Sequence, residues 1–232
     1  MSRLSRLMAI LVATRGTGSL VGAVCRTALE AIEVDGAGLS LISNGHRGPV
    51  CAEGAFAITG EELQFSLGEG PCSDAFSESE LIEVTNISSN QGGTRWPIFT
   101  GAMHEAGLGS LASFPLVIGA ARFGALTVYR SAYGQLSSDQ VADGYLVAQI
   151  AAYLIVAEQA QVDDEAVIPE IEAGFVRMGP LHQATGMIMV QLGIGPEDAL
   201  ARIRGAAYAA NKSALEVAAG IVDETVVLSA DE

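Results

Sequence analysis

The hydrophobic pattern changes character about two thirds of the way along this chain of 232 residues. Before residue 160, short apolar runs of strand length alternate with helical stretches. After residue 170, every apolar stripe has the three- and four-residue spacing of a helix. An acidic run at Val162–Glu165, followed by Pro169, separates the two regions, and such a segment is typical of a linker. We therefore predict one domain over 1–160, a linker over 161–169 and a second domain over 170–232.

The first region has the element order of an α+β domain. Helical spacing covers 4–12 and 19–32, strand-length apolar runs cover 37–42, 49–54, 81–84, 110–118 and 123–130, and further helices are predicted over 74–80, 96–106 and 137–161. Residues 61–65 fit either a short helix or an extended segment. Runs of strands with helices at the ends and between them indicate an antiparallel sheet with flanking helices.

The second region is predicted to be a helical bundle. A helical stretch over 170–192 contains Gly179-Pro180, which predicts a kink or a break. A second helix begins at Pro196, and a third runs from a capping box at Ser213 to about residue 226. Three helices in about 50 residues form a small bundle.

The net charge of −15 argues against binding to a polyanion. Nucleic acids are bound largely through Lys and Arg, because their contacts with phosphates release counterions. From residue 170 onward there are four basic residues against nine acidic ones. Any binding to nucleic acid must therefore depend on a local patch.

The cysteines and histidines do not form a recognisable framework. Cys25, Cys51 and Cys72 are too few for a disulfide-rich fold, so we expect reduced, buried thiols. Neither these residues nor the three isolated histidines have the spacing of a zinc or haem site. We expect no metal and no cofactor.

The N-terminus has two arginines before a short apolar stretch. This pattern resembles a signal peptide only weakly, because Thr14-Arg15-Gly16 interrupts it, and an amphipathic helix fits it better. No apolar run reaches the roughly 18 residues of a membrane span. The sequence therefore favours a cytoplasmic protein without a membrane partner.

Three segments of the second region resemble ANTAR domains. His182–Val190 is similar to their first-helix motif, Gln-Ala-Lys-Gly followed by apolar residues. Glu197–Ala207 is similar to their second helix, and Leu215–Ala218 to the third. The three segments occur in order and at the right spacing, and the resemblance covers about residues 170–226.

Residues 17–160 resemble a GAF domain. Phe65–Cys72 is similar to a segment common in bacterial proteins that join GAF and ANTAR domains. Gly107–Ser110, Phe114–Leu116 and Phe123–Tyr129 are similar to the late strands of GAF domains. The resemblance implies a sensor domain that binds an unknown small molecule or mediates dimerisation.

The two resemblances together imply a transcription antiterminator. ANTAR domains bind paired RNA hairpins in nascent leader transcripts and block a terminator, usually as dimers. The expected protein is thus a signal-transduction and transcription-regulation component, a homodimer and not an enzyme. No receiver-domain aspartate site is visible, so phosphorylation is not the implied input.

Seven residues are candidates for RNA contact. They are His182, Thr185, Gly186, Arg202, Arg204, Tyr208 and Lys212. Loop bases in RNA are read by stacking and hydrogen bonds as well as by charge, which suits a domain with few cations. Thr185 stands where the family often has lysine. Each residue also has a structural interpretation: Gly186 would allow close helix packing, and the arginines would be surface charges or ion-pair partners.

Two other functions remain open at this stage. In one, the ANTAR-like segment serves only protein contacts or dimerisation beside a GAF domain that binds a ligand. In the other, Cys72 and Cys51 act as the thiol pair of a GAF-fold methionine-sulfoxide reductase. A buried structural thiol is the favoured interpretation of Cys72, because Asp74 lies nearby and thiolate activation needs a cation or a helix N-terminus.

Overall fold

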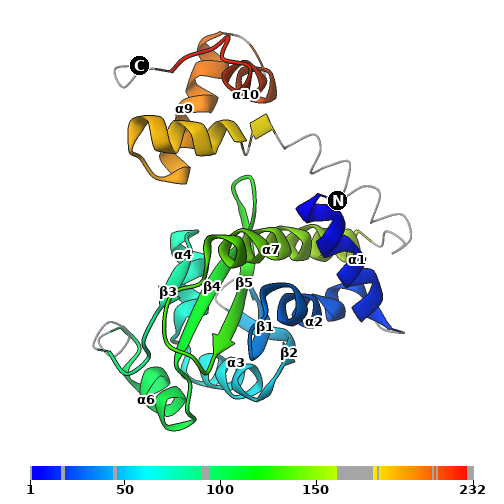
Figure 1. Ribbon diagram of the computed structural model, residues 1–232, viewed down its shortest axis with the longest axis vertical. Helices are drawn as coiled ribbons and strands as arrows, with labels where there is room; N and C mark the ends of the chain where they lie inside the picture. The colour runs from blue at the N-terminus through cyan, green and yellow to red at the C-terminus, as the bar shows by residue number, and fades with distance from the viewer. Residues whose placement is uncertain are drawn as a thin grey trace. The chain divides into compact units, whose positions relative to one another are not determined.

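The computed structural model describes residues 2–16, 19–43, 46–89, 95–160, 180–181, 183–210, 212 and 214–228. The chain divides into two compact units, Met1–Ile168 and Pro169–Glu232 (Figure 1).

Five antiparallel strands form one sheet in the first unit, in the order β2-β1-β5-β4-β3. Their bounds are β1 Gly36–Ser43, β2 His46–Glu53, β3 Ile82–Val84, β4 Ser110–Ile118 and β5 Ala121–Arg130. The predicted α+β class with an antiparallel sheet is confirmed. All five strands lie where strand-length apolar runs predict them, with ends shifted by a few residues.

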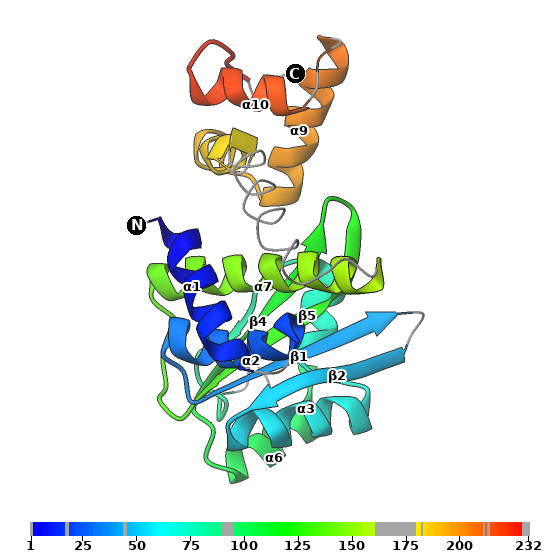
Figure 2. The same ribbon diagram turned by 90° about the vertical axis from the view of Figure 1, so that its right-hand side faces the viewer.

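One face of the sheet is covered by α2 (Leu20–Ile32) and α7 (Ser138–Gln159), and α1 (Arg3–Arg15) packs on these two helices. Alternate strand side chains point to this face, because successive residues of a strand face opposite sides. Phe114 of β4 meets Tyr145 of α7 edge-on, with ring centroids 5.4 Å apart. Figure 2 shows α7 and α3 on opposite sides of β1 and β2.

The opposite face is covered by α3 (Ala55–Leu67) and α4 (Pro71–Glu78), and α6 (Pro97–Glu105) packs against α3. The uncertain segment 61–65 lies inside α3, which is a helix of 13 residues. As the sequence predicts, α6 begins with proline, whose missing N–H costs little in the first turn. The largest buried side chains here include Phe99, Met103 and Tyr129.

The first and last helices of the first unit are joined by ion pairs. Ser137 caps α7 and forms a capping box with Gln140. In the second turn of α7, the nearly buried Asp143 accepts from Arg3 at 3.0 Å and also pairs with Arg6, both from α1. α1 buries Leu7, Met8 and Leu11, as an amphipathic helix should.

By length and apolar composition alone, α7 could cross a membrane. The two helices α1 and α2, taken together as one bent segment, meet the same criterion of length and composition. Half of the apolar window of α7 is buried within the unit, where the helix packs on α2 and β4.

The described residues of the second unit form helices joined by short non-helical segments. Residues 183–192, α9 (Pro196–Ala209) and α10 (Ala214–Val222) share an apolar core. Its buried members include Ala184, Ile188, Ala199, Ile203, Val217, Ala218 and Ile221. The third helix ends four residues earlier than predicted, because Thr225 and Val226 fold back and donate to the carbonyl of Gly220. A break is predicted at Gly179-Pro180, and Gly179 lies outside the described residues.

Candidate functional site

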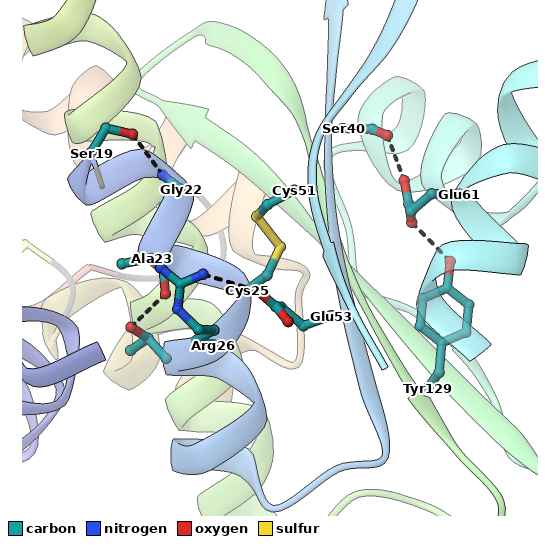
Figure 3. Close-up of a disulfide and its surroundings, with 11 residues drawn as sticks. Ser19, Gly22, Ala23, Cys25, Arg26, Ser40, Cys51, Glu53, Glu61 and Tyr129 are labelled. Carbon is teal, nitrogen blue, oxygen red and sulfur yellow. Dashed lines mark hydrogen bonds and ion pairs between the residues drawn. A yellow bond between two sulfur atoms is a disulfide. The ribbon is translucent and has the colours of Figure 1, made fainter. Parts of the chain in front are cut away.

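A buried polar cluster lies between the sheet and α3. Glu61 of α3 is only 2 % exposed, and its carboxylate accepts from Ser40 Oγ of β1 at 2.5 Å and from Tyr129 OH of β5 at 2.8 Å. These two hydroxyls reach Glu61 from neighbouring strands of the sheet, as Figure 3 shows. The cluster therefore fixes where α3 sits on the sheet.

Gln64 extends the cluster to α4. Its Nε2 donates to Tyr129 OH at 3.0 Å, and its Oε1 accepts from the backbone N–H of Cys72 at 2.8 Å. Burial and the neighbouring Glu61 raise the pKa of Tyr129 well above its ordinary value. The phenol consequently stays protonated at neutral pH and remains a donor to the carboxylate.

Three glycines make room for this cluster. A Cβ on Gly38 would lie 2.4 Å from Glu61 Cγ, and a Cβ on Gly60 would lie 2.6 Å from the Tyr129 ring. A Cβ on Gly70 would meet Gln64 Oε1 at 2.5 Å, and Gly70 has a φ of +136°. These contacts are too short for any side chain, so the cluster depends on glycine at all three positions.

We expect Gly60→Ala to lower the free energy of unfolding by about 1–3 kcal/mol, because the new methyl displaces Tyr129 from Glu61. Gly101→Ala, in helix α6 with open space around it, is the matched control and should stabilise by about 0.5–1 kcal/mol. Urea denaturation measures both. Equal effects of the two substitutions would show that the close approach at Gly60 does not matter.

Two of the three cysteines are not the reduced thiols that the sequence predicts. Cys25 of α2 and Cys51 of β2 form a disulfide, with their Cα atoms 6.0 Å apart, so the expectation of three reduced thiols was wrong. The pair is 26 residues apart, and the intervening helix end and two strands give no local motif from which to predict the pairing. It forms because α2 packs directly against β2.

The disulfide also removes the thiol pair of the reductase hypothesis. Cys51 is opposite Leu39, on the α2 face of the sheet, whereas Cys72 belongs to α4 on the other face. Cys72 does lie in the first turn of a helix, which favours a thiolate, but its side chain is fully buried. Asp74, in the same turn, accepts from Trp96 Nε1 at 3.1 Å and pairs with Arg95.

The helical stretch 183–192 presents two of the candidate RNA-contact residues. Gly186 lies on the exposed side, and a Cβ there would meet no atom within 4 Å, so the described bundle does not need glycine for close packing. Thr185 is half-buried, and its Oγ1 donates to the carbonyl of Leu181 at 2.7 Å. The Thr185 hydroxyl is therefore already engaged by its own helix.

The remaining candidates belong to α9 and the residues after it, except His182, which lies outside the described residues. Arg202 is half-buried and lines a groove between α9 and residues 226–228. Lys212 is exposed, and its backbone N–H donates to the carbonyl of Ala207 at 2.9 Å. Arg204 and Tyr208 lie in α9, but their side chains are outside the described part of the structure.

The sequence interpretation missed the surface around Gly186. Gln183, Gly186, Met187, Val190 and Gln191 line an open hollow, which we call the helix 183–192 face. Val190 is 87 % exposed. The spacing of Gln183, Gly186 and Val190, at three and then four residues, is the signal that would have placed them on one side of the helix.

A GAF domain model matches residues 15–156, and an ANTAR domain model matches residues 180–222. No curated protein matches the chain.

Several solved structures resemble the first unit at low sequence identity. The GAF domain of a phosphoenolpyruvate-protein phosphotransferase from Coxiella burnetii is 15 % identical, with a TM-score of 0.54, over 68 % of this chain and 95 % of that one. The corresponding domain from Acinetobacter is 16 % identical, with a TM-score of 0.53, over 70 % and 99 %. A free methionine-R-sulfoxide reductase from Neisseria meningitidis is 13 % identical, with a TM-score of 0.49, over 68 % and 89 %. The GAF model covers more than half of the chain, so the protein belongs to the GAF domain family and is a regulator that carries an ANTAR domain after its sensor.

Proposed function

We propose that this protein is a transcription antiterminator whose ANTAR domain binds hairpins in leader transcripts under the control of its GAF domain. The ANTAR match over 180–222 carries the proposal. We further propose that it acts as a cytoplasmic homodimer and that its sensor takes an unidentified small molecule.

The helix 183–192 face supports contact with RNA bases. On the same helix, Ala184 and Ile188 point into the core and are fully buried. Gln183, Gly186 and Val190 are exposed. An exposed face with a glycine, an amide and an aliphatic side chain allows close approach of an unstacked base, hydrogen bonding and apolar contact. We assign Thr185 and Gly186 to this contact, with His182, Arg202, Arg204, Tyr208 and Lys212 as the other proposed RNA-binding residues.

The acidic charge of the domain sets the expected mode of binding. With four basic residues against nine acidic ones after residue 169, few phosphates can be neutralised. The slope of log affinity against log salt follows the number of neutralised phosphates. We therefore propose that affinity comes mainly from loop bases and depends only weakly on salt.

We expect Val190→Glu to weaken binding of a tandem-hairpin RNA by about tenfold or more, since it places a charge on a face that meets bases. Ile58→Glu is the matched control: Ile58 is 57 % exposed on α3 of the sensor, and the substitution changes net charge equally. Binding is measured by fluorescence anisotropy at low salt, with thermal unfolding recorded for both variants.

Arg204→Ala is a second variant for the same RNA-binding measurement. If the unmodified protein does not bind the RNA at low salt, or if both Val190→Glu and Arg204→Ala bind it normally, the antiterminator proposal fails.

The exposure of Val190 also favours a second candidate function, in which the ANTAR domain makes protein contacts only. An aliphatic side chain exposed to this degree is suited to a protein interface as well. In that case Val190→Glu would reduce self-association in sedimentation experiments, and the unmodified protein would show no affinity for RNA.

A further inference from the structure

We propose that Cys25 and Cys51 form a reversible thiol–disulfide site, opened by a dithiol reductant, that controls how firmly α2 is held to the edge strand β2. The inference rests on the proposed function in one respect. A protein that acts on nascent RNA works where thiols are kept reduced, and a disulfide in such a compartment is usually a transient or sensing one.

The disulfide joins two elements of different kinds. Cys25 lies in α2 of the helical layer, and Cys51 lies in β2 at the edge of the sheet. Figure 3 shows the bond crossing from α2 to the strands, on the side away from Glu61. Opening it would therefore act on the junction between the helical layer and the sheet and leave the buried polar cluster in place.

The two sulfurs differ in their access to a reductant. Cys25 is fully buried, whereas Cys51 is half-buried. The strand is also irregular at this point, since Leu39 pairs with Cys51 and Ser40 pairs with Pro49, leaving Val50 between them without a partner. Val50 is 38 % exposed. The sulfur of Cys51 is therefore the one that a reductant reaches first.

A charged pair lies beside the disulfide. Arg26, next to Cys25, donates to Glu53 Oε1 at 3.0 Å, and both side chains are more than one third exposed. Among the described polar contacts, this pair alone would tie α2 to β2 after reduction, and exposed ion pairs contribute little.

A thiolate of the dithiol attacks Cys51 Sγ, the sulfur–sulfur bond breaks, and Cys25 leaves as a thiolate that takes up a proton. The second thiol of the reductant then attacks the mixed disulfide and releases Cys51, which is protonated in turn. Two electrons and two protons pass to the protein, and the reductant leaves as a disulfide.

The consequence reaches the last helix of the sensor. α2 packs against α1, against α7 and against strands β1 and β2. Arg26 Nε also donates to the carbonyl of Thr14 at 2.9 Å, which ties α2 to the end of α1. Release of α2 from β2 therefore loosens the helical layer that includes α7, after which the chain continues to the ANTAR domain.

The test uses the full-length protein equilibrated with mixtures of oxidised and reduced dithiothreitol. Each sample is labelled with N-ethylmaleimide in the native state and mapped by mass spectrometry, and hydrogen exchange is followed in parallel. We expect Cys51 to be labelled once the reduced form dominates, while the buried Cys72 stays unlabelled in both states. We also expect exchange in α2 and β2 to be at least threefold faster after reduction, with α4 and α6 unchanged.

The variant Cys25→Ala/Cys51→Ala is the matched control and should show the faster exchange at every ratio. The inference is overturned if the oxidised protein carries three free thiols on denaturation, if α2 and β2 exchange equally in both states, or if reduction unfolds the whole domain. Absence of RNA binding in both states would count against the proposed function alone, because labelling and exchange do not involve RNA.

Discussion

Replacing Glu61 with alanine is expected to lower the free energy of unfolding by about 3 kcal/mol. The substitution removes the acceptor of Ser40 Oγ and of Tyr129 OH, both in fully buried residues. A buried hydroxyl left without its partner costs roughly 1–3 kcal/mol, and here two are affected together. Urea denaturation followed by circular dichroism measures the change.

A surface glutamate provides the comparison. Glu53→Ala breaks the ion pair with Arg26, whose members are 38 % and 41 % exposed, and should cost less than about 1 kcal/mol. Glu61→Gln, which keeps the side-chain length and one carbonyl oxygen, should fall between the two. Comparable losses for Glu61→Ala and Glu53→Ala would mean that the buried cluster does not hold α3 on the sheet.

Reduction of the disulfide is expected to lower the free energy of unfolding by about 3 kcal/mol as well. Cys25 and Cys51 are 26 residues apart, so the bond removes a loop of that length from the unfolded chain and with it much of the conformational entropy of that loop. Parallel urea titrations with and without a reductant measure the difference. The slope of the transition should change too, because the cross-link compacts the unfolded state.

Two variants separate the disulfide from the third cysteine. Cys25→Ala/Cys51→Ala should have lower stability that no longer responds to the reductant, whereas Cys72→Ala should respond as the unmodified protein does. A reductant effect that persists in the double variant would assign the change to something other than this bond.

The element order was predictable because it depends on local pattern. The apolar runs of β4 and β5, the proline at the start of α6 and the Ser137 cap of α7 each need only a few neighbouring residues to be recognised. The α3 helix was harder, since Gly60 weakens its helical signal and is required only by Tyr129, 69 positions further along. The Cys25–Cys51 pairing and the Glu61 cluster likewise join residues from different elements, and no single segment carries a pattern for them.

The helix at 183–192 was predictable from the sequence, whereas the side that it turns to solvent was not. The motif around Gly186 marked the helix, but apolar residues in a motif are usually assigned to the core. Val190 instead points to solvent, while Ile188 is fully buried. Thr185 stands where the family often has lysine, and its hydroxyl donates to the backbone of its own helix. Which side of a helix faces inward depends on the other helices of the bundle.

The two edges of the sheet restrict how copies of this protein can associate. One edge is β3, which is only three residues long, and the other is β2, which contains Pro49 and the unpaired Val50. Proline lacks a backbone donor, and short or irregular edge strands are poor templates for a strand from another molecule. The sheet is therefore closed to growth by strand addition, which protects it from aggregation. If copies of the first unit do associate, the outer surfaces of its helices are the surfaces left for that contact.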